Sequence, residues 1–280
     1  MLTKITIIFI FLIKIFDTIL NNLFGIDFYG FLNDKLTQRY CELKIKKKKI
    51  KFFIPNHITK WRVNTFFNKE PETLNWIDNF NKKRKIVFWD IGSNIGLYSI
   101  YAALLFDKIK IYSFEPSFLN LNILSRNIYI NKLRKKINIF QLPLSNNKNS
   151  FQSMNETTLS SGGAHSTFGA TFTKQKIINS YKILGTSLDN AIEKKLIEMP
   201  DYIKIDVDGI EYLILIGFSK FLSNKKTKSI LIEINKGEVN KNKKIFNLLK
   251  KNKFKLKSIE QSKISREGDK KTYNYIYNKV

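Results

Sequence analysis

The clearest pattern in the sequence is a series of short apolar runs followed by segments with helical periodicity. The runs are rich in β-branched and aromatic residues and end at polar or acidic residues, which is typical of buried parallel strands. They occupy residues 86–89, 110–114, 137–140, 202–205 and 229–234. Helical spacing after the first, second and fourth runs predicts repeated strand-helix units and therefore an α/β fold.

The first 65 residues do not follow this pattern and are predicted to form an N-terminal extension. Residues 5–24 are mainly apolar but contain Lys14 and Asp17. A membrane span needs about 20 nearly uncharged residues, and a secretory signal ends at small residues. Neither fits cleanly, so two interpretations stay open: a helix docked on the core, or an interfacial helix that brings residues 1–24 to a membrane surface.

The remaining segments are predicted from weaker patterns. Residues 40–54 alternate as a hairpin, residues 61–67 are expected to form a loop or short strand, and residues 71–80 have a helical apolar face after Pro71. The polar stretch 146–173 is either a floppy hairpin or a lid over a substrate. The C-terminal residues 245–277 should add a helix and one or two strands.

Composition narrows the class of protein without naming a function. The apolar fraction of 43% is enough for a substantial core, and the single cysteine, Cys41, excludes an intramolecular disulfide and favours a reducing compartment. The formal charge of +26 resembles that of nucleic-acid-binding proteins. Only six of the 49 basic residues are arginine, however, which favours a solvated lysine surface over a phosphate-binding groove.

Candidate chemistry begins at the end of the first run, in the segment Asp90-Ile-Gly-Ser-Asn-Ile-Gly96. Gly92 and Gly96 permit a tight turn whose free N–H groups face a ligand. A dinucleotide-binding turn has glycine where this chain has Asp90. A carboxylate there would repel a pyrophosphate and attract a cation, and the ammonium and sulfonium groups of S-adenosylmethionine fit that requirement.

Further acids follow the later runs. Glu115-Pro116 ends the second run, 19 residues after Gly96, where an acid can accept both ribose hydroxyls of a nucleoside. The turn that ends at Ser145 should lie beside the adenine ring. Asp206, Asp208 and Glu211 follow the fourth run, at the sheet edge where open α/β folds bind ligands.

These motifs together resemble the FkbM family of S-adenosylmethionine-dependent O-methyltransferases, a group of class I Rossmann-like methyltransferases. The resemblance covers roughly residues 66–235, and the chain differs from the family pattern at Ser93, usually alanine, and at Asp208, usually glutamate. Its carriers are Glu70-Pro71-Glu72-Thr73 with Trp76-Ile77, Asp90-Ile-Gly-Ser-Asn-Ile-Gly-Leu-Tyr-Ser-Ile100, Phe114-Glu115-Pro116, Asn127, Asn131, Thr186-Ser-Leu-Asp189 and Ile203-Lys-Ile-Asp-Val-Asp-Gly-Ile-Glu211.

The resemblance implies a fold, a cofactor and an acceptor. Residues 66–280 should form a methyltransferase domain with a mostly parallel seven-stranded sheet and helices on both faces. The acceptor implied is a hydroxyl of a sugar, glycan or glycosylated metabolite, often in polysaccharide biosynthesis. Residues expected to contact S-adenosylmethionine are Asp90, Gly92, Ser93, Asn94, Gly96, Glu115, Pro116, Ser145 and Asp206.

The proton of the acceptor hydroxyl needs a base, and Asp206 is the first candidate, followed by Asp208 and Glu211. No metal is indicated, although Asp206 and Asp208 are the pair that would hold a divalent cation if one is used. Two other functions stay open: an RNA methyltransferase, which steeply salt-dependent RNA binding would reveal, and a non-catalytic subunit that binds S-adenosylmethionine. We expect a cytoplasmic protein, with membrane association left open, and no specific nucleic-acid partner.

Overall fold

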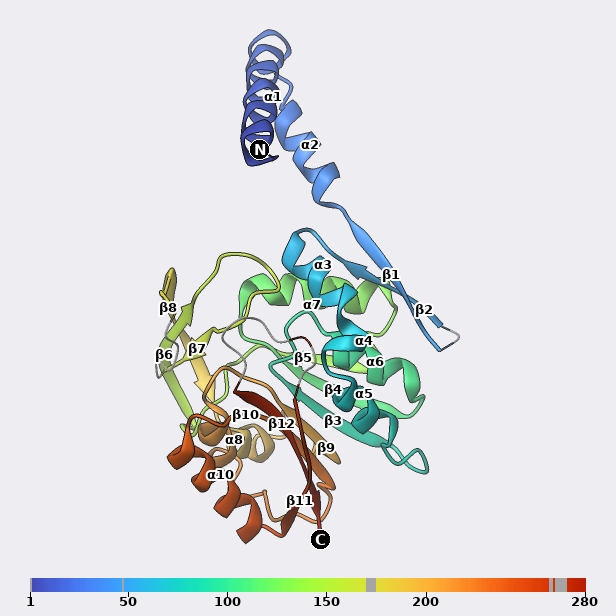
Figure 1. Cartoon of the computed structure of the whole chain (residues 1–280), viewed down its shortest axis with the longest axis vertical. Coiled ribbons are helices and arrows are strands. Elements are labelled where there is room, and N and C mark those ends of the chain that lie inside the picture. Colours follow the sequence, from blue (N-terminus) through green and yellow to red (C-terminus); the bar gives the residue numbers. More distant parts are fainter. Residues whose placement is uncertain (1, 47, 170–174, 262–263, 265–270) are drawn as a thin grey trace.

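The computed structural model describes residues 2–46, 48–169, 175–261, 264 and 271–280. A seven-stranded mixed sheet forms its centre, in the order β11-β12-β10-β9-β3-β4-β5 (Figure 1). Strand β12 runs antiparallel to both of its neighbours, and the pairs from β10 to β5 are parallel. The strands are β3 (Ile86–Ile91), β4 (Ile109–Phe114), β5 (Ile137–Phe140), β9 (Tyr202–Ile205), β10 (Ser229–Asn235), β11 (Phe254–Glu260) and β12 (Thr272–Lys279).

Helices cover both faces of this sheet, which confirms the predicted Rossmann-like fold. Helices α5, α6 and α7 pack on one face, and α8, α9 and α10 pack on the other. Because side chains alternate along β3, Phe88 belongs to the first core and Trp89 to the second. The helices are α5 (Pro71–Asp78), α6 (Leu97–Leu105), α7 (Phe118–Ile130), α8 (Leu188–Glu193), α9 (Glu211–Ile216) and α10 (Val239–Lys251).

The hairpin of β1 (Tyr40–Ile45) and β2 (Lys48–Phe53) packs against the domain that the seven-stranded sheet and its helices form. Phe52 is fully buried in the first core, and the backbone N–H of Phe53 donates to Asn127 of α7. The packing therefore joins this part of the predicted extension to the domain.

The segment after the hairpin is helical, so the prediction of a loop or short strand at residues 61–67 was wrong. The observed elements are α3 (His57–Asn64) and α4 (Phe66–Lys69). A capping box between Asn56 and Thr59 starts α3, because each side chain accepts from the backbone N–H of the other. The apolar residues in this stretch have no clear helical period, which is why the sequence did not show it.

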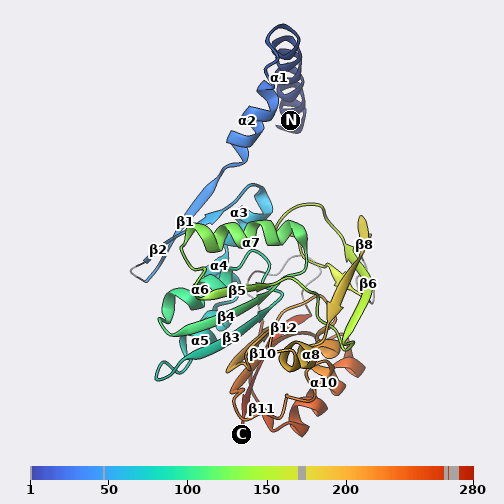
Figure 2. The ribbon, with the colours of Figure 1, turned by 180° about the vertical axis from the view of Figure 1, so that it is seen from behind.

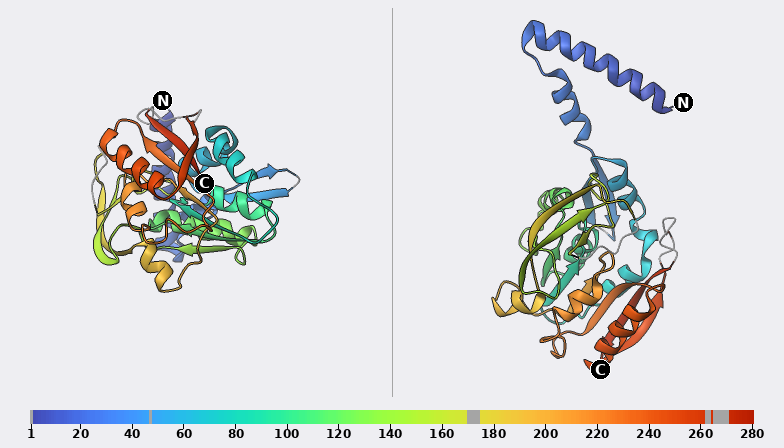
Figure 3. Two further views of the ribbon diagram at one scale, coloured as in Figure 1. Left: turned by 90° about the horizontal axis from the view of Figure 1, so that it is seen from below. Right: turned by 90° about the vertical axis from the view of Figure 1, so that its left-hand side faces the viewer.

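The first two helices lie outside the domain. Helix α1 (Leu2–Phe24) contacts α2 (Phe28–Thr37) and stands clear of the sheet and its covering helices (Figure 3). Its segment Lys4–Phe24 is, among the described residues, the helix long and apolar enough to cross a membrane, and none of its most apolar window is buried. The structure therefore does not show the docked helix that the sequence left open.

The predicted polar insertion, residues 146–173, contributes two strands to a three-stranded antiparallel sheet, and the third strand follows it. Its strands are β6 (Asn149–Glu156), β7 (Thr167–Phe168) and β8 (Asn179–Thr186), in the order β7-β6-β8. The loop between β6 and β7 reaches α3, where Asn56 donates to the carbonyl oxygen of Ser161. Residues 170–174 of the insertion lie outside the described residues.

Candidate active site

A cavity opens at the carboxyl ends of five adjacent parallel strands, β5, β4, β3, β9 and β10. Each strand end contributes to its lining, and the residues are, in that order, Leu142, Glu115, Gly92, Asp206 and Glu233. This is the edge at which open α/β sheets bind ligands. Of the acids that the sequence analysis placed at strand ends, Glu115, Asp206 and Asp208 line this cavity.

The glycine loop after β3 forms one wall of the cavity. Gly92 has φ +81°, and any Cβ there would collide with the backbone carbonyl oxygen of Asp206 at the end of β9. The N–H groups of Gly92 and Ser93 both donate to the carbonyl oxygen of Phe114 at 3.0 Å. The loop is thus fixed between β4 and β9, and Gly92, Ser93 and Asn94 line the cavity while Gly96 starts α6 behind them.

Glu115 lies in the lining beside that loop. Its side chain is 5% exposed, and its carboxylate accepts from the backbone N–H of Asn94 at 2.8 Å and of Ser117 at 3.0 Å. Burial raises the pKa of Glu115 to about 7, although these two hydrogen bonds act to lower it. The adjacent Pro116 also lines the cavity, as predicted.

An apolar slot adjoins Glu115. Leu142, Pro143 and Leu144 follow β5 and line it, together with Phe168 and Ile210. Ser145 does not line the cavity, which differs from the prediction. Its N–H donates to the carbonyl oxygen of Thr186 at 2.9 Å, and its hydroxyl accepts from the N–H of Asn147. The sequence analysis placed an adenine ring at this turn, and that placement stays a prediction; the side chains that line the cavity here are apolar.

Asp90 is placed behind the glycine loop and is absent from the cavity lining. It is fully buried, and its Oδ2 accepts from the hydroxyl of Ser99 at 2.6 Å. Oδ1 has no hydrogen-bond partner among the described residues. Burial raises the pKa of Asp90, and the ammonium of Lys204 on the neighbouring strand opposes that rise. Asp90 thus lies beneath the glycine loop and does not line the cavity, whereas the sequence analysis expected it to contact the cofactor.

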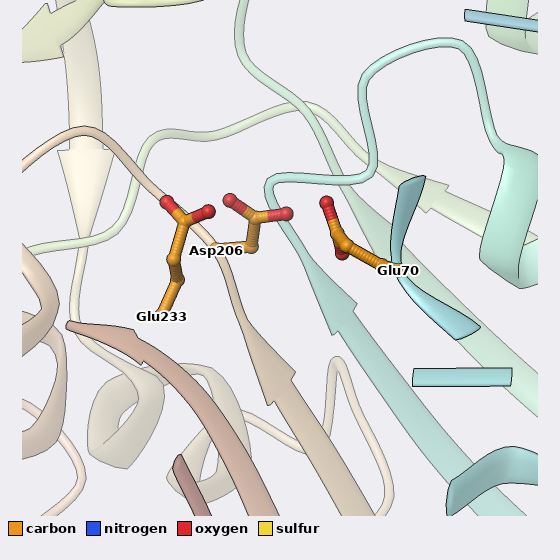
Figure 4. Close-up of side chains that lie close together, drawn as sticks. All are labelled: Glu70, Asp206 and Glu233. Atoms are coloured by element: carbon orange, nitrogen blue, oxygen red, sulfur yellow. The ribbon is translucent and has the colours of Figure 1, made fainter. Parts of the chain in front are cut away.

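Three carboxylates converge at the other end of the cavity. Glu70 precedes α5, Asp206 follows β9 and Glu233 lies on β10, and Figure 4 shows their side chains pointing toward one another. One oxygen from each lies within 4.8 Å of the others. Two lysines offset their charge: Lys69 Nζ is 2.6 Å from Glu70 Oε1, and the buried Lys204 forms an ion pair with Asp206.

These carboxyl groups differ in their proton affinity. Burial acts to raise the pKa of Asp206, but the ammonium groups of Lys204 and Lys69 outweigh it and lower the pKa to about 2. The carboxylate of Glu233 accepts no hydrogen bond from a described residue, and its burial beside Asp206 and Glu70 raises its pKa well above the usual range. Asp206 is therefore a weak base, whereas Glu233 binds a proton much more strongly.

The other two predicted catalytic acids are placed differently. Asp208 lines the cavity, with Oδ1 3.3 Å from Nδ1 of His165. Glu211 lies at the start of α9, where it accepts from the N–H of Gly209 at 2.9 Å and pairs with Lys241 at 3.5 Å. Glu211 is absent from the cavity lining. The structure thus brings Asp206 and Asp208 to the cavity and leaves Glu211 outside it.

The loop between β6 and β7 covers the glycine loop. Arg62 Nε of α3 donates to the carbonyl oxygen of Gly162 at 2.6 Å, and Asn94 Nδ2 donates to that of Gly163 at 2.7 Å. Asn120 accepts from the N–H of Gly162 at 2.8 Å. Of the two interpretations of the insertion, the described part of this loop fits a cover over the cavity.

Sequence reasoning missed Lys69, Glu70 and Tyr98 as site residues, and it gave no role to Glu233, which it placed near the same edge of the sheet. Tyr98 lines the cavity and donates from its hydroxyl to Glu70 Oε2 at 2.8 Å. Glu233 carried a signal, since it is the one acid within the apolar run of β10. The sequence signal for Glu70 was weaker, because an acid before Pro71 is equally typical of the start of a helix.

The carboxylate cluster has the oxygen ligands that a divalent cation prefers. Glu70 and Asp206 are each already paired with a lysine, and a cation would have to displace or repel those ammonium groups. Asp208, the second ligand considered from the sequence, is not part of the cluster. An acidic cluster of this kind does not by itself establish a metal site.

The sequence profile of the methyltransferase FkbM domain matches residues 90–256. This range includes the glycine loop, Glu115, Asp206 and Glu233, and it ends within β11. No protein of curated function is significantly similar to the chain in sequence.

Several solved structures resemble the fold at low sequence identity. An FkbM methyltransferase from Methylobacillus flagellatus is 16% identical, with a TM-score of 0.46 over 69% of this chain and 44% of its own. Precorrin-6y C5,15-methyltransferase from Geobacter metallireducens is 12% identical, with a TM-score of 0.44 over 75% and 87%. An rRNA methylase from Streptococcus thermophilus is 11% identical, with a TM-score of 0.45 over 75% and 95%.

Proposed function

Since the chain belongs to the methyltransferase FkbM family, we propose that it transfers the methyl group of S-adenosylmethionine to a hydroxyl oxygen of a sugar or glycan. The profile covers more than half of the chain and includes the cavity residues from Ile91 to Glu233, whereas the lining residues from Trp61 to Glu70 precede it. S-adenosylmethionine is the cofactor expected for this family. It supplies a methyl carbon bound to a positively charged sulfur, which leaves as a neutral thioether.

The lining residues fit this cofactor. A carboxylate has about four acceptor positions, and the two backbone N–H groups bonded to Glu115 leave others for ribose hydroxyls. The apolar slot at Leu142 and Leu144 suits an aromatic base. Gly92 keeps the wall between β3 and β9 free of side-chain atoms. The acids at Asp206 and Glu233 favour a positive charge between these two regions.

The single observation that carries the choice of acceptor is the composition of the cavity's far end. Phe66 and Tyr98 bring aromatic rings there, and Glu70 and Glu233 bring carboxyl groups; Trp61 and Asp208 also line the cavity. Sugar hydroxyls donate well to carboxylates, and the apolar faces of sugar rings pack on aromatic rings. The same carboxylates would repel nucleic-acid phosphates, so they argue against RNA despite the basic surface.

The chain's own residues can manage the proton of the acceptor. Asp206 stays ionised in its ion pair with Lys204 and positions charge, but its low pKa makes it a poor proton acceptor. Glu233 has the higher proton affinity, and a cation in the cavity favours its ionised form. As the carbon-oxygen bond forms and the carbon-sulfur bond breaks, Glu233 takes the hydroxyl proton. We therefore assign the role of general base to Glu233 in place of Asp206.

Label transfer tests the function as a whole. The full chain is incubated with methyl-labelled S-adenosylmethionine and, separately, nucleotide sugars, glycan fragments and RNA. Label in a sugar or glycan product, stable to mild acid as a methyl ether is, supports the proposal. Label in the RNA fraction alone would replace it, and binding of S-adenosylmethionine without transfer to any of these acceptors would favour a non-catalytic role.

The first prediction concerns Glu115. Replacing Glu115 by glutamine should weaken S-adenosylmethionine binding about 10- to 100-fold, because a charge-assisted hydrogen bond to the ribose contributes about 1.5–3 kcal/mol. Equilibrium dialysis with labelled cofactor measures the change. Glu156→Gln is the matched control, since Glu156 is also buried near Ser117 but does not line the cavity. Equal effects in both variants would show that Glu115 acts only through folding.

The second prediction is a pH dependence of the same binding. The pKa of Glu115 is raised to about 7, so below that pH the group holds a proton and loses its strength as an acceptor. Affinity for S-adenosylmethionine should therefore rise with pH and level off above about 7. Dissociation constants measured across this range test the sign, and the Glu115→Gln variant should lack the step. An affinity that falls with rising pH would contradict the assignment.

A further inference from the structure

Helix α1 presents an apolar surface that no part of the domain covers. Its 23 residues correspond to about 34 Å of helix, enough to reach through the apolar core of a bilayer. Ile8 is 60% exposed and Phe11 is 62% exposed, and other large apolar side chains surround the helix between them. An exposed apolar surface of this size in water indicates a partner.

The polar residues that interrupt the apolar run are accounted for within the helix pair. Asp17 of α1 accepts from the backbone N–H of Tyr29 at 2.7 Å, and the ammonium of Lys14 lies 5.9 Å from the ring centre of the same tyrosine. Phe16 and Phe28 pack edge to face at 5.2 Å. Lys14 and Asp17 thus lie on the side of α1 that faces α2, and residues 7–13 before them are all apolar.

Basic residues lie at the end of α2 and after it. Their positive charge indicates that the surface bound by these helices is anionic. Lys35 lies in the last turn of α2, Arg39, Lys44 and Lys49 follow that helix, and all four are exposed. Basic residues that flank an apolar helix favour the cytoplasmic side of a membrane and bind its anionic lipids. The catalytic domain lies on this basic side.

The connection between the helices and the domain is short and fixed. Arg126 of α7 donates to the side chain of Gln38 at 3.0 Å and to the hydroxyl of Tyr40 at 2.7 Å. The N–H of Ile54 donates to the carbonyl oxygen of Arg39 at 2.8 Å. The chain is therefore held by the domain immediately after α2 ends at Thr37.

The cavity is covered from the same end of the domain. Helix α3 begins three residues after Ile54 and contributes Trp61 and Arg62 to the lining. Helix α3 and the loop between β6 and β7 both lie at the end from which α1 and α2 project, opposite the C-terminus (Figures 1 and 2). That loop also carries Leu159, which is 61% exposed.

We propose that α1 and α2 bind the protein to a bilayer of anionic lipid and hold the α3 side of the cavity at the membrane surface. The catalytic domain then faces the cytoplasm, where its acceptor is a glycan carried on a lipid. The statement about the acceptor rests on the proposed function, whereas membrane binding does not. A cleaved secretory signal would lack this role, but the residues after α1, Gly25-Ile-Asp-Phe28, offer only one small side chain for cleavage.

Flotation of the full chain with vesicles tests membrane binding. The vesicles are phosphatidylcholine, alone or mixed with phosphatidylglycerol, and the double variant Ile8→Asp/Phe11→Asp is compared with the parent. Two carboxylates in the apolar surface should reduce the floating fraction at least about tenfold. The control Val239→Asp/Leu256→Asp changes two exposed apolar residues of α10 and β11, outside α1 and α2, and should float like the parent.

The outcomes separate this inference from the proposed function. A parent chain that stays out of the vesicle fraction, an Ile8→Asp/Phe11→Asp variant that floats as well as the parent, or purified protein cleaved after α1 would each overturn membrane binding. S-adenosylmethionine binding, measured on the same samples, should be equal in parent and variant. Label transfer to a lipid-linked glycan in vesicles should be at least about tenfold slower with the variant, while transfer to a soluble glycan should be unchanged. Equal rates on the lipid-linked glycan would overturn the assigned orientation.

Discussion

Replacing Glu233 by glutamine is expected to lower kcat about 100- to 1,000-fold and to weaken S-adenosylmethionine binding far less, because Asp206 keeps its negative charge in the cavity. Glutamine keeps the size of the side chain but cannot take the proton of the acceptor hydroxyl. Glu233 is suited to this role because its carboxylate lies beside that of Asp206 and accepts no hydrogen bond from a described residue. Its pKa is also raised. Steady-state label transfer with the soluble acceptor measures the effect.

The pH profile distinguishes a base from a structural residue. Since Glu233 has a pKa above the usual range, its ionised form increases as the pH rises, and kcat of the parent should rise with it. The Glu233→Gln variant should lose that rise. Glu72→Gln is the matched control, because Glu72 is buried, accepts from Asn274 at 2.7 Å and lies outside the cavity lining. A fall in kcat of less than about threefold for Glu233→Gln would assign the base elsewhere.

Replacing Gly92 by alanine is expected to remove measurable S-adenosylmethionine binding and to lower the free energy of unfolding by at least about 2 kcal/mol. The positive φ of Gly92 strains any side chain, and the added Cβ would collide with the carbonyl oxygen of Asp206. The loops after β3 and β9 would have to separate, which deforms the cavity wall. Denaturant unfolding and equilibrium dialysis measure the two effects.

Gly237→Ala provides the control for this substitution. Gly237 lies in the turn before α10, where a Cβ would meet only the side-chain oxygen of Asn235 at 3.1 Å and the side chain of Lys271 at 3.7 Å. Its effect on the free energy of unfolding should stay within about 0.5 kcal/mol. A Gly92→Ala variant that binds the cofactor like the parent would show that the close approach of the two loops is not needed.

The sequence predicted the sheet well because its central strands are buried on both faces. Such strands appear as continuous apolar runs, and β3, all six residues of which are buried, is the clearest case. The acids that end β4 and β9 were also predicted to reach one edge, since parallel strands place their carboxyl ends together. Helix α3 was missed because it depends on a capping box at Asn56 more than on an apolar period.

The site was predicted less completely, because side-chain direction and tertiary contacts decide it. Asp90 and Glu115 both end strands, yet Asp90 points beneath the loop toward Ser99 and Glu115 lines the cavity. Glu70 and Glu233 are 163 positions apart in the sequence and meet only because β10 pairs with β9 and the start of α5 crosses the sheet edge. Which acid holds a proton depends on Lys69 and Lys204, whose positions no local pattern indicates.

Calorimetric titration of the purified, folded chain with S-adenosylmethionine tests the central claim most directly. The arrangement of Gly92, Glu115 and the carboxylates at Asp206 and Glu233 predicts saturable binding at one site per chain, which Glu115→Gln weakens and Gly92→Ala removes. If neither S-adenosylmethionine nor S-adenosylhomocysteine binds, or if both variants bind them as the parent does, the cavity is not the cofactor site and the proposed function fails with it.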